Sequence, residues 1–166
     1  MKIYLSKINE SWIVDRVRAE WYKYNPSIST EKIKDANIIW IIAPWVWKKT
    51  PKRHLKNKKV ICSYYHFDFD KFGQKEKENF YNLDQYVDEY HVISEITKEQ
   101  LSILTDKKIT SIPFWVNQNI WYEIENKEGL RKSFDIDDED YLVGSFQRDT
   151  EGHDLISPKL EKGPDI

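Results

Sequence analysis

In this chain of 166 residues, several features that identify particular classes of protein are scarce or absent. It has a single cysteine, Cys62, so no disulfide can form within the chain, and this suits a reducing cytoplasm. Its 26 lysines and arginines nearly balance its 28 aspartates and glutamates, and the net charge of -2 predicts no general attraction to nucleic acid. We therefore expect a cytoplasmic protein that has no nucleic-acid partner.

Long apolar runs are missing as well. The longest, residues 38–47, is broken by Pro44, and no stretch reaches the ~18 apolar residues that a membrane span needs. At the N-terminus Lys7, Asn9 and Glu10 interrupt the apolar character too early for a signal peptide. We predict no transmembrane segment, while peripheral contact with a membrane stays open.

The motifs of several common enzyme classes are also absent. The four histidines lack the spacing of zinc ligands, and the chain contains no P-loop, no G-x-G-x-x-G and no G-x-S-x-G pattern. We therefore expect no metal and no cofactor. The chain does have 40% hydrophobic and 14% aromatic residues, which supply the material of a packed core.

Short apolar runs alternate with amphipathic stretches, and this alternation predicts βαβ units around a parallel sheet. The expected fold class is α/β, a Rossmann-like parallel sheet with helices on both faces. Ser11 and Ser94 are expected to cap helices, and Pro26 to end the first of them. The expected strands are residues 2–6, 38–43, 60–65, 87–93 and 108–112, and the expected helices include 76–85 and 96–104.

The pattern changes after Pro113. Residues 114–125 are rich in aromatic and amide side chains without clear periodicity, which indicates a connector. Residues 127–134 predict a short helix and 141–146 a strand, but no helix follows that strand. We predict a first domain at 1–113, a hinge at 114–125 and an incomplete, truncated second α/β domain at 126–166. The unfinished strand could also pair with a second copy and give a homodimer.

Four blocks of sequence resemble the group 1 glycosyltransferases, the large retaining family of the GT-B fold. The first two are VICSYYHFD at residues 60–68 and VDEYHVISE at 87–95. The third is KITSIPFWVN at 108–117, followed by Trp121 and GLRKSF at 129–134, and it is similar to the family's hinge. The fourth, YLVGSFQR at 141–148 with KLEKGPD at 159–165, is similar to the start of the donor domain.

The resemblance implies transfer of a sugar from a nucleotide-diphosphate sugar to a glycan or lipid-linked acceptor, in polysaccharide or glycoconjugate biosynthesis. It assigns Arg148 and Lys162 to the donor diphosphate, whose growing charge these cations would offset. Because most of the donor domain is missing, we expect the chain alone to be inactive. The sequence departs from the family's pattern at 114–115, which reads Phe-Trp in place of Asn-Gly, and at 6–11, which has no glycine.

Ligands of open α/β sheets bind beyond the carboxyl ends of the strands, and this directs attention to the residues that follow each expected strand. His66 and Asp68 follow strand 60–65 and are the candidate catalytic residues, because imidazole and carboxylate groups can orient or polarise an acceptor hydroxyl. Trp45, Trp47 and Asn9 are the candidate acceptor-binding residues.

Each candidate has a structural alternative. His66 and Asp68 could be satisfied within their loop, Trp45 and Trp47 could be buried, and Asn9 could bond its own backbone in a turn. Without the resemblance, Arg148 and Lys162 are ordinary surface cations. His91, inside an expected strand, is interpreted as a hydrogen-bonded histidine of the sheet, and Trp115 and Trp121 as packing in the hinge.

The alternative function is a non-catalytic α/β module that binds a carbohydrate or a protein through its aromatic side chains. Balanced charge, absent motifs and abundant aromatic residues are compatible with both functions. The transferase interpretation depends on the residues after Pro113.

Overall fold

The computed structural model describes residues 1–9, 13–67 and 69–142. Residue contacts divide the chain into two compact units, Met1–Val116 and Asn117–Ile166. Among the residues that the structure describes, no helix has the length and apolar character that a membrane crossing requires.

The first unit contains one sheet of five parallel strands, in the order β1-β2-β3-β4-β5. The strands are β1 (Ile3–Leu5), β2 (Ile38–Ile41), β3 (Lys59–Tyr64), β4 (Glu89–Val92) and β5 (Lys108–Ser111). Each predicted strand of the first domain is present, and the prediction of a parallel α/β sheet is confirmed. Because all strands run the same way, their carboxyl ends share one edge of the sheet.

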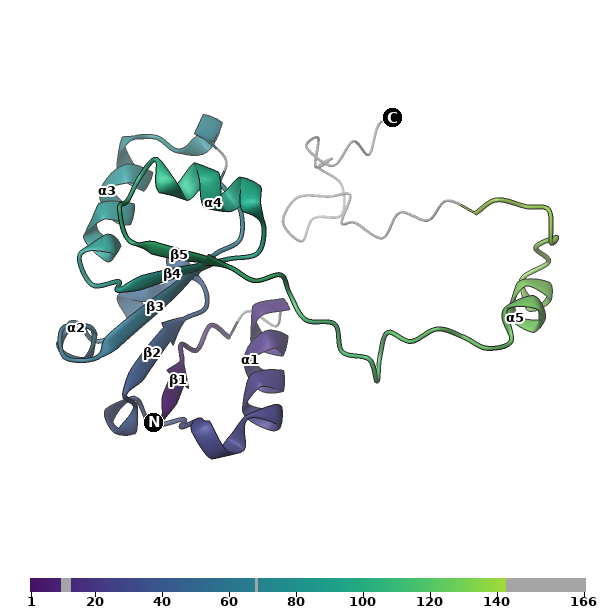
Figure 1. Ribbon diagram of the computed structural model, residues 1–166, viewed down its shortest axis with the longest axis horizontal. Coiled ribbons are helices and arrows are strands. Elements are labelled where there is room, and N and C mark those ends of the chain that lie inside the picture. Colours follow the sequence, from purple (N-terminus) through teal and green to yellow (C-terminus); the bar gives the residue numbers. More distant parts are fainter. Residues whose placement is uncertain (10–12, 68, 143–166) are drawn as a thin grey trace. The chain divides into compact units, whose positions relative to one another are not determined.

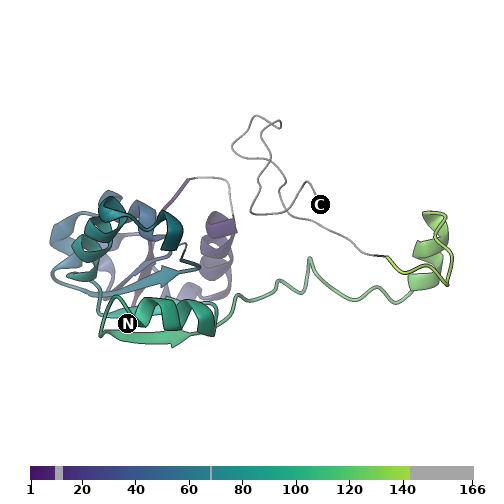
Figure 2. The same ribbon diagram turned by 90° about the horizontal axis from the view of Figure 1, so that it is seen from above.

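Helices connect successive strands, as parallel pairing requires. They are α1 (Ile13–Tyr24), α2 (Lys52–Leu55), α3 (Gln74–Asp84) and α4 (Glu95–Ser102). Figure 1 shows α1 beside β1, and Figure 2 shows α1 well apart from α3. Ser94 caps α4 as predicted, since its Oγ accepts a hydrogen bond from the Thr97 N–H at 3.2 Å. Ser11 lies outside the described residues.

Two apolar clusters cover opposite faces of the sheet. Alternate strand residues such as Ile39, Cys62 and Tyr90 pack against Phe80 of α3 and Leu101 of α4. The other cluster joins the opposite face of β1 and β2 to α1, and its buried members are Leu5, Ile8, Val14, Ile42, Ala43 and Val46. Helices thus pack on both faces, as the sequence predicted.

The face that α1 covers becomes more polar toward β5. There the side chains that alternate with the buried Tyr90 and Val92 are Glu89 and His91, and Thr110 is the partner of His91 on β5. Parallel strands whose two faces are both covered by helices usually have apolar side chains on both. Glu89, His91 and Thr110 therefore indicate a part of this face that helices do not fully cover, and a cavity lies there.

The described part of the second unit contains one regular element, α5 (Lys127–Ser133). The Asn126 side chain caps it by accepting a hydrogen bond from the Gly129 N–H at 2.9 Å. The helix predicted at 127–134 is therefore present. The strand predicted at 141–146 lies mostly outside the described residues, no second domain is evident within them, and the predicted division into domain, hinge and second domain stays a prediction.

Candidate functional site

A cleft of about 710 Å³ lies at the carboxyl edge of the sheet, beyond the ends of β2 and β3. We call it the carboxyl-edge cleft. The 3₁₀ helix Pro44–Lys49 supplies one wall and the loop after β3 another. Its lining includes Trp45, Lys48, His66, Phe67, Lys75 and Asn79. The sequence-predicted candidates Trp45 and His66 thus share one cleft at the edge where α/β proteins bind ligands.

The two tryptophans of the 3₁₀ helix have different surroundings. Trp45 is 51% exposed and lines the cleft, whereas Trp47 is 3% exposed and packs in the core. The Trp47 indole N–H donates to Asn79 Oδ1 at 3.2 Å. Successive side chains of a 3₁₀ helix are about 120° apart, so residues two positions apart do not share a side. Trp47 therefore has no exposed ring face to offer an acceptor.

The loop after β3 is held in place by stacked rings. Phe67 stacks on Tyr64, the last residue of β3, with ring centroids 4.8 Å apart, and Phe69 stacks on Phe67 at 6.0 Å. Phe72 meets Phe67 edge to face at 5.7 Å. The stacked pair of Tyr64 and Phe67 thus flanks the exposed His66 on both sides in the sequence.

Charged side chains around the carboxyl-edge cleft are mostly basic. Lys48, Lys71 and Lys75 line it together with Glu76 and Glu78. Glu78 accepts a hydrogen bond from the Gln74 side chain at 2.9 Å, and the Lys48 ammonium lies 5.9 Å from the centroid of the Trp47 ring. The lysines were not among the residues that we selected from the sequence, where they appear as ordinary surface charges.

Not all predicted site residues come together. Asn9 is exposed, has a left-handed backbone with φ of 62°, and donates its N–H to Asp15 Oδ1 at 3.1 Å. Asparagine tolerates this backbone conformation better than most residues, so a role in the turn explains why Asn9 is found there. Asn9 is not among the residues that line the carboxyl-edge cleft. Asp68, Arg148 and Lys162 lie outside the described residues.

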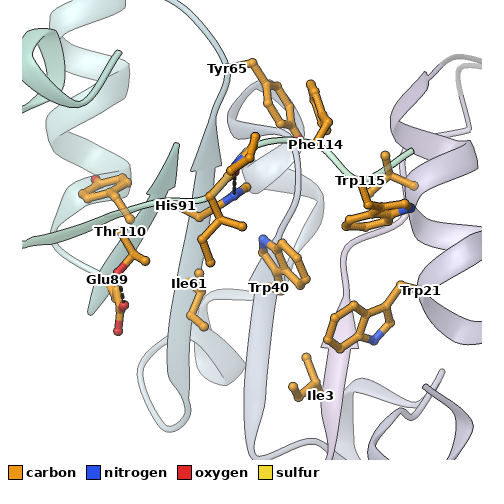
Figure 3. A pocket seen from close by; sticks show the side chains of 14 residues that line it. Ile3, Trp21, Trp40, Ile61, Tyr65, Glu89, His91, Thr110, Phe114 and Trp115 are labelled. Carbon is orange, nitrogen blue, oxygen red and sulfur yellow. Dashed lines mark hydrogen bonds between the residues drawn. The ribbon is translucent and has the colours of Figure 1, made fainter. Parts of the chain in front are cut away.

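A second cavity, of about 350 Å³, lies on the sheet face that α1 partly covers. We call it the sheet-face cavity, and Figure 3 shows its aromatic lining. Trp21 of α1 meets Trp40 of β2 edge to face at 5.2 Å, and Tyr65 stacks on Phe114 at 5.1 Å. No pattern in the sequence brings these rings together, because they come from distant segments.

Residues 113–115 form one wall of this cavity, and we call them the strap. After β5, the Ile112 N–H donates to the Val92 carbonyl at 2.8 Å, and the strap then returns across the sheet to α1. There the Trp115 indole N–H donates to Glu20 Oε2 at 2.7 Å. Phe114 and Trp115, which the sequence analysis placed in the hinge, therefore contact the first unit.

A chain of hydrogen bonds borders the sheet-face cavity. The Trp40 indole N–H donates to the buried Ser63 Oγ at 2.8 Å, and Ser63 Oγ lies 2.9 Å from His91 Nδ1. His91 Nε2 lies 2.9 Å from the Ile112 carbonyl oxygen, which only accepts, so Nε2 carries the proton and Nδ1 accepts from Ser63. The interpretation of His91 as a hydrogen-bonded histidine of the sheet is confirmed.

The protonation of His91 fits this arrangement. Burial lowers the pKa of His91 below its ordinary value of 6.5, and the hydrogen bond to the Ile112 carbonyl opposes that shift. The neutral imidazole is therefore the favoured form. This suits a histidine that links strands by hydrogen bonds better than one that acts as a general acid.

The described residues contain no group of three or more histidine, cysteine, aspartate or glutamate side chains that could hold a metal ion. The chain has a Rossmann-like parallel α/β sheet. Comparison with protein-family models, with curated proteins and with solved structures finds no significant match.

Proposed function

We propose that the chain provides the acceptor side of a retaining glycosyltransferase, which moves a sugar from a nucleotide-diphosphate sugar to a glycan or lipid-linked acceptor. One observation carries the proposal: Trp45 and His66 line the same cleft at the carboxyl edge of a parallel sheet. The resemblance assigns the domain that contains this cleft to the acceptor. The order of the four sequence blocks adds support.

The cleft has the chemical groups that an acceptor sugar needs. The half-exposed ring of Trp45 offers an apolar surface for the C–H face of a pyranose. The exposed His66 imidazole can donate or accept one hydrogen bond and so orient the acceptor hydroxyl. Asp68, two residues later, is the carboxylate proposed to polarise that hydroxyl. Trp45 comes from the 3₁₀ helix and His66 from the loop after β3, so the proposed sugar would contact two segments of the cleft lining.

Charge in the cleft favours an acceptor that carries an anionic group. Lys48 and Lys75 line it, and an ammonium group is a good partner for a phosphate or a carboxylate. A lipid-linked acceptor has a phosphate next to its first sugar, so the basic lining favours that class over a neutral glycan. Arg148 and Lys162 are the proposed partners of the donor diphosphate.

A carbohydrate-binding module is the second candidate. Every residue described for the carboxyl-edge cleft belongs to the first unit, so binding to the cleft needs nothing from the residues after Val116. The two functions differ in one requirement: a transferase must also bind a nucleoside diphosphate, and a module need not.

Two binding measurements on the full chain test both functions. Immobilised glycans, neutral and phosphorylated, measure the acceptor side, and calorimetric titration with UDP and GDP measures the donor side. The transferase proposal predicts glycan binding that Trp45→Ala weakens, and diphosphate binding that Arg148→Ala and Lys162→Ala weaken.

Tyr24→Ala is a matched control, because Tyr24 is 53% exposed at the end of α1 and lines neither cavity. Diphosphate binding that Arg148→Ala and Lys162→Ala weaken would favour the transferase over the module. Absence of glycan binding, or wild-type glycan binding by Trp45→Ala, would contradict both.

A further inference from the structure

The sheet-face cavity is separate from the carboxyl-edge cleft. Tyr64 at the end of β3 lines the cleft, and its neighbour Tyr65 lines the sheet-face cavity. Successive side chains of a strand point to opposite faces of the sheet, so the two sites lie on opposite faces. An inference about the sheet-face cavity therefore goes beyond the proposed function and does not depend on it.

The size and walls of the cavity suit a small ring compound. Its volume of about 350 Å³ lies within the range of small-molecule sites, about 300–1,000 Å³. A dry apolar cavity of about 150 Å³ already holds benzene, so two fused rings have enough room here. Aromatic walls pack well against flat rings, by stacking or edge to face. The rings come from α1, β2, the end of β3 and the strap: Trp21, Trp40, Tyr65, Phe114 and Trp115.

The cavity lining is polar at Glu89 and Thr110. Glu89 Oε1 accepts hydrogen bonds from Lys108 Nζ and Thr110 Oγ1, both at 2.8 Å. Its other oxygen, Oε2, lies 3.6 Å from Lys59 Nζ. The hydrogen bonds from Lys108 and Thr110 hold the pKa of Glu89 below its ordinary value, so the carboxylate is charged near neutral pH.

The Glu89 carboxylate favours a ligand whose hydrogen-bond donor is uncharged. A carboxylate can accept about four hydrogen bonds, so Glu89 can take one more in addition to those from Lys108 and Thr110. Because Lys59 and Lys108 already offset its charge, a cationic ligand gains little there. A hydroxyl group adds no charge and can donate.

We propose that the sheet-face cavity binds a neutral, flat and mostly apolar ring compound with one hydroxyl group. The rings lie among the aromatic side chains, and the hydroxyl donates to Glu89. The strap forms one wall of the site, so an occupied cavity packs Phe114 and Trp115 against the ligand as well as against Tyr65 and Glu20.

Calorimetric titration of the full chain with 2-naphthol tests the proposal. We expect one saturable site, and binding of 2-methoxynaphthalene, which has no donor, about tenfold weaker. Glu89→Gln should reduce this preference for the hydroxyl, because the acceptor loses its charge. Thr110→Trp should fill the cavity from the edge strand and weaken 2-naphthol binding more than tenfold.

Ile103→Ala is the control, since Ile103 is 75% exposed and lines neither cavity. Circular dichroism checks that each variant is folded, and Ile61→Phe, which fills the cavity from β3, replaces Thr110→Trp if that variant is not. Absence of saturable 2-naphthol binding, equal affinity for the two naphthalenes, or wild-type binding by a folded filling variant would overturn the proposal.

Discussion

Replacing Ser63 with alanine tests whether the hydrogen-bond chain across β2, β3 and β4 stabilises the sheet. Ser63 is fully buried, and its Oγ accepts from the Trp40 indole at 2.8 Å and lies 2.9 Å from His91 Nδ1. The substitution removes a single oxygen and leaves the strand backbone intact. It deprives the part-buried Trp40 N–H of its acceptor, and such a loss costs about 1–3 kcal/mol where water does not replace the acceptor.

Urea denaturation followed by far-ultraviolet circular dichroism measures this loss. We expect a lower midpoint with an unchanged slope, because the surface exposed on unfolding stays the same. Ser102→Ala is the matched control: Ser102 is exposed, and its Oγ donates to the Glu99 carbonyl at 2.7 Å. Surface substitutions usually change stability by less than about 0.5 kcal/mol. A Ser63→Ala effect no larger than that of Ser102→Ala would show that the hydrogen bonds of Ser63 do not stabilise the sheet.

Three further predictions concern stability. Because burial lowers the pKa of His91 in the folded protein, the free energy of unfolding should be highest above about pH 6.5 and should fall as the pH drops toward the folded-state pKa. Urea denaturation at pH 7 and pH 5 measures this change in the free energy of unfolding, which should be smaller in His91→Gln than in the wild type. Ser94→Ala should cost about 0.5–2 kcal/mol in the same assay, through loss of the α4 cap, and no loss would contradict the cap. Trp115→Phe should cost about 1–3 kcal/mol by removing the bond to Glu20, and a double-mutant cycle with Glu20→Ala should show coupling.

The order of strands and helices in the first unit could be read from the sequence because each strand is a compact apolar run with a clear end. Residues 38–43 and 60–65 have this form, and β2 and β3 lie within a residue or two of the expected bounds. The cap at Ser94 was predictable for the same reason, since N-capping is a local interaction.

Side-chain direction in the loops was harder to predict. Trp45 and Trp47 alternate with Val46, and an extended backbone would place both indoles on one side. The 3₁₀ helix at Pro44–Lys49 separates them, so that only Trp45 reaches the carboxyl-edge cleft. Nothing local in the sequence distinguishes these two backbones.

The sheet-face cavity was missed because its walls come from segments far apart in the chain. One signal was nevertheless present: Glu89 and His91 alternate with apolar residues in β4, and Thr110 follows Ile109 in β5, although the α/β pattern expects strands that are apolar on both faces. These polar side chains in β4 and β5 predict a sheet face that helices cover only in part. The aromatic residues Phe114 and Trp115, assigned to the hinge, are part of that cover.

The central claim is that the carboxyl-edge cleft binds the acceptor sugar between Trp45 and His66. The most direct measurement is nitrogen–proton NMR of the full chain during titration with the glycan that binds best. The account predicts that the Trp45 indole and His66 signals shift with saturation, while the Trp40 indole signal, on the other face of the sheet, stays in place. Shifts at Trp40 with unchanged Trp45 and His66 signals would contradict it.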